Sequence, residues 1–322
     1  MKESKNALMQ DVGVSKSIGS MERLLVVGYI FFAKRHGSRL KNNDAVYYPM
    51  DLKKTYPIAQ HFSLERKELT DEGWLTCLGI NDFDSNESQW TQWLHPEEAT
   101  YYQSLSAQNR KQSFLFGRVC AKTAYLNANP QETPPNVHIR TGIFKDPILQ
   151  NQSTTQWQVG ITHSKSIAAA LVFPATHPMA IDVEEWDTKR ATTMRTQCHS
   201  EELHSLEKIG LGSAASGAVG WTAKEAISKA LRTGMTCPFS LFGIKSIETH
   251  PDGGIRGLFI NFCQYQFRSW IIEDKVLSIV LPKRTRLLFS ENGPKLTNTT
   301  SKARGLPSVH DASHAHSPFS GS

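Results

Sequence analysis

The sequence predicts an α+β fold with two halves of similar size, at about residues 60–180 and 181–285. Apolar residues recur with helical spacing in both halves, and runs rich in β-branched and aromatic residues lie between these segments. A Pro-Asp-Gly-Gly turn divides the strand-like residues 240–282, which predicts a β-meander. The predicted helices lie near residue 95 and at residues 109–127, 198–209 and 218–233. No internal repeat is evident residue by residue.

The two ends of the chain differ from its middle in composition. Residues 1–20 are polar with weak periodicity, and residues 287–322 are rich in Ser, Gly, Pro, Asn, Thr and His. Such segments bury too little apolar surface to offset the entropy of folding, so we predict that both are disordered. The predicted subdomains therefore span residues 21–180 and 181–286.

Bulk composition excludes several classes of protein. The chain has 322 residues, of which 39% are hydrophobic and 20% charged, as in ordinary globular proteins. Its longest apolar run, residues 24–33, is too short to cross a bilayer and lacks the flanks of a secretory signal. We therefore predict a cytoplasmic protein with no membrane partner. Five scattered cysteines without a Cys-x-x-Cys pair argue against a disulfide framework and against a structural zinc site.

The basic net charge belongs mostly to the C-terminal tail. Of the formal charge of +6, residues 282–322 carry +4, from six basic and two acidic side chains, which leaves +2 for the rest. A charge of this size on the body does not indicate a nucleic-acid-binding face. We expect no nucleic-acid partner.

A basic amphipathic helix is predicted at residues 109–127, after a helix start at His95-Pro96-Glu97-Glu98. Its apolar residues alternate with basic ones, among them Arg110, Arg118 and Lys122. A solvated basic face over an apolar stripe is the simplest explanation of this pattern.

Two carboxylates share one side of a predicted strand at Ile181-Asp182-Val183-Glu184. Side chains alternate along a strand, so Asp182 and Glu184 project to the same side, while Ile181 and Val183 point into a core. Neighbouring carboxylates repel each other, and a divalent cation removes that penalty. Ligands that are all oxygens suit Mg²⁺. The alternative is an edge strand with a solvated acidic face.

The helix around residues 220–230 places Trp221, Glu225 and Lys229 along one face. Glu225 could give a third oxygen to the same cation, and Lys229 could face phosphates held by that cation. The alternative is an ordinary helix ion pair, with Thr222-x-x-Glu225 as a capping box.

A third polar element, Gly160-Ile161-Thr162-His163-Ser164, stands at the end of a predicted strand. A histidine and hydroxyls at such a place suit contacts to phosphate oxygens. A histidine that is merely hydrogen-bonded within the fold is the alternative.

These three elements together resemble the 4′-phosphopantetheinyl transferase superfamily, and in particular its long, monomeric, surfactin-type (Sfp-like) subclass. The resemblance is carried by ITHS at 161–164, by AIDVE at 180–184, where Ala180 replaces the usual Gly, and by WTAKEAISK at 221–229. It covers roughly residues 90–285. The fold that it implies is a pseudo-twofold pair of similar α/β subdomains with the substrate cleft between them.

The resemblance also implies roles for individual residues. The magnesium ligands would be Asp182, Glu184 and Glu225, and either Glu225 or Lys229 would assist deprotonation. The coenzyme A phosphates would be contacted by His163, Ser164, Lys224 and Lys229. The 3′-phosphate of coenzyme A would lie near the basic helix, at Arg110, Arg118 or Lys122. The stretch Gly142-Ile143-Phe144-Lys145-Asp146-Pro147 departs from the family's G-x-x-G-K-P pattern, which leaves Lys145 as a candidate. The resemblance also implies a loose match between Glu202 and a further acidic position of the family.

The activity implied by the resemblance is transfer of the 4′-phosphopantetheine arm of coenzyme A to a serine of an apo acyl or peptidyl carrier protein, with Mg²⁺ as cofactor. The expected partners are coenzyme A and carrier domains, and a polyunsaturated fatty acid or polyketide synthase is the favoured source of the carrier. Two alternatives remain open: a Mg²⁺-dependent hydrolase of coenzyme A or a nucleotide pyrophosphate, and a carrier-binding module without catalysis.

Overall fold

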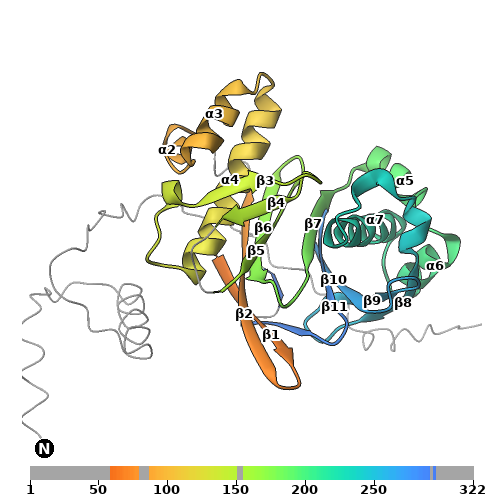
Figure 1. Cartoon of the computed structure of the whole chain (residues 1–322). Helices are drawn as coiled ribbons and strands as arrows, with labels where there is room; N and C mark the ends of the chain where they lie inside the picture. Colours follow the sequence, from red (N-terminus) through yellow and green to blue (C-terminus); the bar gives the residue numbers. More distant parts are fainter. Residues whose placement is uncertain (1–58, 80–86, 151–154, 291–292, 295–322) are drawn as a thin grey trace, which may run out of the picture. The chain divides into compact units, whose positions relative to one another are not determined.

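A computed structural model describes residues 59–79, 87–150, 155–290 and 293–294 (Figure 1). The disorder predicted for residues 1–20 and most of the predicted C-terminal tail lie outside these residues. The described chain forms two five-stranded sheets and one two-stranded sheet. The fold is α+β, as the sequence predicts.

The first five-stranded sheet has the order β12-β1-β2-β6-β5, and all its neighbouring strands are antiparallel. Its strands are β1 Ala59–Arg66, β2 Leu69–Gly79, β5 Trp157–His163, β6 Ile167–Pro174 and β12 Arg286–Phe289. β12 comes from the far end of the chain, and Phe289 pairs with Phe62 of β1. The prediction that residues 287–322 are disordered is wrong at its start, because the apolar Leu287 and Phe289 join this sheet and its core.

The second five-stranded sheet has the order β7-β11-β10-β9-β8. Its strands are β7 Ala180–Glu185, β8 Ile244–Thr249, β9 Ile255–Phe259, β10 Tyr265–Ile272 and β11 Lys275–Pro282. The last four form the meander that the Pro-Asp-Gly-Gly turn predicts, and β7 adds antiparallel to β11. The separate two-stranded sheet consists of β3 His138–Thr141 and β4 Pro147–Gln150.

One long helix packs on each five-stranded sheet, α4 on β2, β5 and β6, and α7 on β7, β10 and β11. The α-helices are α2 Glu87–Thr91, α3 Pro96–Ser104, α4 Gln108–Ala128, α5 Thr188–Arg195, α6 Ser200–Lys208 and α7 Ser213–Ala230. Short 3-10 turns are η3 Pro134–Asn136, η4 Gly234–Thr236 and η5 Phe239–Phe242. None of the helices within the described ranges is long and apolar enough to cross a membrane.

Three hydrophobic clusters define a layered arrangement of helix, sheet, sheet and helix. One cluster joins α4 to the first sheet, another joins α7 to the second sheet, and the third lies between the two sheets. Strand β6 is buried along its whole length because it contributes to two of these clusters, Ala170 to the first and Leu171 to the third. This double burial explains why its sequence is a continuous apolar run rather than an alternating one.

Strand β7 has one apolar and one acidic face. Ile181 and Val183 lie in the core between the sheets, as the alternation predicts. Asp182 and Glu184 point the other way, toward α7, which brings them to the residues described next.

Candidate active site

The site forms where the edge strands of the two five-stranded sheets, β5 and β7, lie side by side (Figure 1). Gly160 of β5 permits this approach, because a Cβ at that position would stand 3.3 Å from Cγ2 of Ile181. Two residues further along, the hydroxyl of Thr162 links β5 to β7. It donates to Oδ1 of Asp182 at 3.0 Å and accepts from the backbone N–H of Val183 at 3.2 Å.

Three carboxylates converge beside this contact. One oxygen from each of Asp182, Glu184 and Glu225 lies within 4.8 Å of the others. Asp182 is almost fully buried, and its Oδ2 has no hydrogen-bond partner among the residues that the structure describes. A buried carboxylate oxygen without a partner is costly unless a cation or water satisfies it. The chemistry of this donor set, all oxygen and carrying three acidic groups, fits Mg²⁺.

Lys229 approaches the cluster from one turn further along α7. Its Nζ lies 2.5 Å from Oδ1 of Asp182 and 3.2 Å from Oγ1 of Thr162. Burial lowers the pKa of Lys229, but the carboxylates of Asp182, Glu225 and Glu184 raise the pKa by more, so the net shift is upward. The ammonium is therefore held in its charged form. Lys229 of α7 pairs with Asp182 of strand β7, rather than with Glu225 one turn away on its own helix.

The pKa values of the other two acids are raised. Burial is the largest cause for Glu225, followed by the charge of Asp182, and together they raise its pKa to about 7 despite the opposing effect of Lys229. Burial and Asp182 also raise the pKa of Glu184, while Arg190 opposes that rise. Crowded acids of this kind are a recognised signature of a functional site.

Sequence reasoning missed two residues of this site. Arg190, on α5, places Nη2 2.5 Å from Oε2 of Glu184. Its proximity follows from the way α5 turns back along α7, which no local pattern reveals. Thr162 falls within the polar element found in the sequence, but we expected its hydroxyl to face phosphate. It faces Asp182 and Lys229 instead.

A basic cavity of about 490 Å³ adjoins the end of β5. It brings together four of the predicted coenzyme A ligands: Arg110, Arg118, Lys145 and His163. Loss of solvation and the nearby ammonium of Lys229 lower the pKa of His163. Arg118 is buried and lies 3.0 Å from Oε1 of Glu98, and its guanidinium stacks over the ring of Phe114.

Lys122 does not reach this cavity, contrary to prediction. Its side chain is fully buried, and its Nζ lies 2.6 Å from Oε2 of Glu98. The ammonium also donates to the carbonyl oxygens of Trp93 and Pro134. The basic residues of α4 therefore do not form a uniform solvated face, because Arg118 and Lys122 both pair with the buried Glu98.

Lys224 and Ser164 are also turned away from the predicted phosphate position. Lys224 is fully buried and pairs with Glu202 at 2.7 Å, because it lies on the opposite side of α7 from the carboxylate cluster. Ser164 donates to Oε1 of Glu185 at 2.9 Å. The alternative of a capping box at Thr222 is excluded, since α7 begins at Ser213 and the Thr222 hydroxyl donates to the carbonyl oxygen of Ala218.

Lys145 lies in the turn between β3 and β4, with a backbone φ of +63°. This left-handed conformation favours glycine, which is the residue that the family pattern G-x-x-G-K-P has at the same place. The side chain of Asp146, at the place of the family's lysine, lies 3.4 Å from Nε of Arg232. Lys145 lines both the basic cavity and a second cavity of about 550 Å³ that also reaches Lys229.

Comparisons with known proteins agree with part of this picture. Residues 178–283 match the family model of the 4′-phosphopantetheinyl transferase superfamily. This span holds the three carboxylates and Lys229, so the resemblance inferred from the motifs is confirmed at the level of the superfamily over that part of the chain. The comparison with curated proteins found no match.

One similar solved structure is a holo-(acyl-carrier-protein) synthase from Bacillus anthracis str. Ames, in complex with CoA (3′,5′-ADP). The sequence identity is 20%, and the alignment covers 35% of this chain and 96% of that chain, with a TM-score of 0.30. A likeness of this extent carries no functional conclusion.

Proposed function

We propose that this protein is a Mg²⁺-dependent 4′-phosphopantetheinyl transferase, which converts an apo carrier protein to its holo form with coenzyme A as co-substrate. The observation that carries the proposal is the meeting of three carboxylates and Lys229 between β7 and α7, within the span that matches the superfamily. The basic cavity beside this cluster supplies the charge that a nucleotide with several phosphates needs.

Asp182, Glu184 and Glu225 would hold the magnesium ion, which supplies Lewis-acid stabilisation to pyrophosphate oxygens when it is bound. The partnerless Oδ2 of Asp182 supports this assignment. Lys229 contacts Oδ1 of the same carboxylate, and it would orient Asp182 while offering its charge to a phosphate oxygen.

The basic cavity would bind the adenosine 3′,5′-bisphosphate half of coenzyme A. Arg110 and Arg118 lie on α4, while Lys145 and His163 come from the facing turn and strand, so a phosphate there meets cations from two sides. The second cavity, which shares Lys145 with the first, would take the pantetheine arm, because most of its lining is apolar and it also reaches Lys229.

In the proposed reaction, the serine oxygen of the carrier attacks the β-phosphorus of coenzyme A. The bond from that phosphorus to the bridging oxygen breaks, and adenosine 3′,5′-bisphosphate leaves. We assign the serine proton to Glu225, a carboxylate of this cluster that is not fully buried. Lys229 suits that role less, since its pKa is raised and its ammonium stays charged. The charge of Lys229 would instead stabilise the leaving phosphate.

The long, monomeric, Sfp-like subclass fits one feature of the fold. A single chain supplies both edge strands of the site, β5 from one sheet and β7 from the other, so no second copy is needed to complete it. We propose a monomer that acts on the carrier domains of a polyunsaturated fatty acid or polyketide synthase in the cytoplasm. Panels of carrier proteins would define this preference.

The test is intact-protein mass spectrometry of apo carrier proteins incubated with the full chain, coenzyme A and Mg²⁺. We expect each accepted carrier to gain the mass of one phosphopantetheine and EDTA to abolish the gain. Asp182→Asn and Glu225→Gln should abolish transfer while circular dichroism shows a folded protein. Glu185→Gln is the matched control, because Glu185 lies on the same strand but binds Ser164 and Ser166 instead.

Two outcomes would replace the proposal. Cleavage of coenzyme A without any gain in mass on fatty-acid, polyketide or peptidyl carriers would indicate the hydrolase. Binding of carrier or coenzyme A with neither transfer nor cleavage would indicate a module without catalysis.

A further inference from the structure

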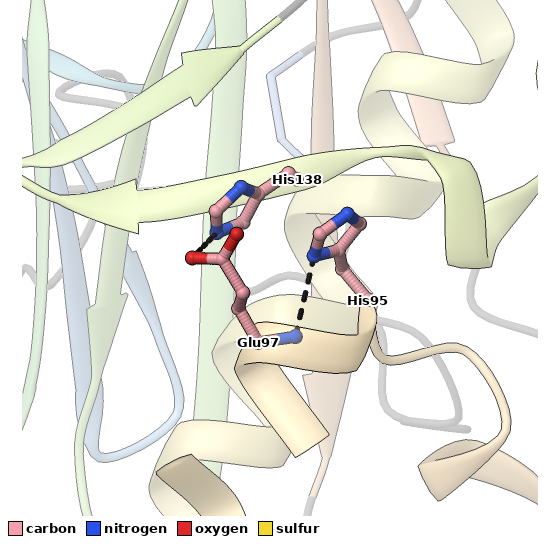
Figure 2. A group of neighbouring side chains, drawn as sticks. All are labelled: His95, Glu97 and His138. Atoms are coloured by element: carbon pink, nitrogen blue, oxygen red, sulfur yellow. Dashed lines mark hydrogen bonds and ion pairs between the residues drawn. The ribbon is translucent and has the colours of Figure 1, made fainter. Parts of the chain in front are cut away.

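A second group of metal-binding side chains lies apart from the carboxylate cluster, where the start of α3 meets β3. Figure 2 shows His95, Glu97 and His138 gathered there. One ring nitrogen from each histidine and one oxygen of Glu97 lie within 4.8 Å of one another. The three residues line a cavity of about 680 Å³ that shares no lining residue with the two cavities of the proposed active site.

The two histidines are held in place by a buried acid below them. Glu98 accepts a hydrogen bond from the backbone N–H of His95 at 2.9 Å and from that of Ile139, next to His138, at 3.1 Å. Glu98 is only 3% exposed, and Lys122 and Arg118 neutralise it. This network fixes the backbone at both histidines, so the two side chains start close together before any ion binds.

The donor set differs from that of the carboxylate cluster. Two imidazoles and one carboxylate suit borderline metals such as Zn²⁺, whereas three carboxylates suit Mg²⁺. We propose that His95, Glu97 and His138 form a Zn²⁺ site with three protein ligands and a fourth position open to water. The cysteine spacing argues only against zinc sites built from cysteine.

Binding of an ion requires a change in the orientation of the imidazole rings. The two imidazole rings are stacked 4.2 Å apart with only 6° between their planes. One ion cannot lie in both of two parallel ring planes, so one ring has to turn about its χ2 torsion, which has a broad energy well. The polar contacts that hold the two rings in their present orientation are weak. The hydrogen bond from the Glu97 N–H to Nδ1 of His95 is long, at 3.4 Å, and Nε2 of His138 is 3.8 Å from the Glu97 carboxylate.

A bound ion would tie α3 to β3. The positive end of the α3 dipole opposes a cation at this place, and Glu97, together with Glu132 in the same cavity, offsets it. The ion would restrict the position of Glu98, and through Glu98 that of Arg118, which lines the basic cavity. The zinc would therefore stabilise the contact between α3 and β3. This role does not depend on the proposed transferase activity.

The experiment measures zinc held by the untagged full chain after dialysis against Zn²⁺ with excess Mg²⁺, which occupies the hard oxygen ligands. We expect His138→Ala and His95→Asn each to hold one zinc fewer per chain than the unmodified protein. Asparagine keeps the helix-capping ability of position 95 while it removes the imidazole, so a folding defect is not expected. Co²⁺ added in place of zinc should give the intense visible bands of a four-coordinate site in the unmodified chain, and these bands should be lost in His138→Ala and His95→Asn.

Two matched controls separate this site from other histidines. His204→Ala removes an exposed histidine on α6, and His314→Ala with His316→Ala removes two from the C-terminal tail. Both controls should keep the zinc and the cobalt bands that His138→Ala loses. Equal zinc content in the unmodified chain and in folded His138→Ala, or loss of the bands only in the tail variant, would overturn the proposal.

Discussion

Lys224 and Glu202 form a buried ion pair, with 2.7 Å between Nζ and Oε2, and the same pair occurs in the other half of the protein as Lys122 and Glu98 at 2.6 Å. In each half the lysine lies on the long helix that covers the sheet, and the glutamate lies in the first turn of the short helix at its side. Both lysines are fully buried.

The hydrogen bonds of the two glutamates repeat as well. Glu98 accepts from the backbone N–H groups of His95 and Ile139, and Glu202 accepts from those of His199 and Ile244. The histidine precedes the helix in both halves, and the isoleucine belongs to a following strand. The two halves are therefore related down to single hydrogen bonds. This supports a structural role for both lysines instead of the phosphate contacts predicted for them.

We predict that Lys224→Met destabilises the protein by about 3–5 kcal/mol, the usual cost of leaving one partner of a buried ion pair uncompensated. Urea unfolding measures this directly. The matched control is Lys208→Met, which removes an exposed lysine on α6 and should have a much smaller effect. If Lys224→Met were as stable as the control and instead lost affinity for coenzyme A, Lys224 would be a ligand after all.

A short sequence motif of this relationship can be found once the structure is known. His-x-Glu-Glu occurs at 95–98 and again at 199–202, each at the start of a short helix. A buried lysine follows each motif more than twenty residues later, on the long helix. The motif is short, and its histidine and first glutamate are common in exposed helix starts. Its meaning depends on the second glutamate being buried, which only tertiary packing decides.

The carboxylate cluster could be predicted from the sequence better than the basic side chains proposed to bind phosphate. Strand alternation alone places Asp182 and Glu184 on one side, and helix spacing places Lys229 beside Glu225. The direction in which a basic side chain points cannot be predicted in this way. Arg110 and Lys122 lie on the same helix, yet Arg110 lines a cavity and Lys122 pairs with a buried acid. Nothing in the local pattern separates them, since the acid, Glu98, comes from another helix.

Arg110 offers a test of what the basic cavity binds. We predict that Arg110→Ala raises the KM for coenzyme A about tenfold, as expected for loss of one charge-assisted contact. Stability should not change, because Arg110 is exposed. Steady-state kinetics with 3′-dephospho-coenzyme A forms the control. If Arg110 contacts the 3′-phosphate, the variant and the unmodified enzyme will have similar KM values for that substrate, whereas a persistent tenfold difference would place Arg110 at another phosphate.

Stability of the metal-free protein should fall as the pH rises from about 4.5 to about 7. The folded-state pKa of Glu225 is raised from 4.5 to about 7, so in this window the folded chain binds more protons than the unfolded chain. More protons bound in the folded state means that stability is lost with rising pH. Magnesium would replace that proton, so the rise in Tm on adding Mg²⁺ should be larger at pH 8 than at pH 5. Each kcal/mol corresponds to roughly 2–4 °C in a protein of this size.

Glu225→Gln is the control for this pH dependence. It removes the titrating group and one proposed ligand, so we expect a flatter profile of Tm against pH and a smaller shift with Mg²⁺. Differential scanning fluorimetry across the pH range measures both. Superimposable profiles for the variant and the unmodified protein would assign the pH dependence to other groups.

Gly160 sets the distance between the two edge strands, and we predict a graded response to enlarging it. In Gly160→Ala the new Cβ meets Cγ2 of Ile181 at 3.3 Å, so Ile181 has to yield by a few tenths of an ångström. In Gly160→Val the extra methyl groups press on β7, and overpacking of this kind costs roughly 1–3 kcal/mol. Because Thr162 and Asp182 bridge the same strands, transfer activity should fall more steeply than stability along the series. Thr162→Val removes the bridging hydroxyl without widening the strands, and kcat should fall in this variant as well. If Gly160→Val lowers stability but keeps full activity with Mg²⁺, the close approach of β5 to β7 is not needed for the site.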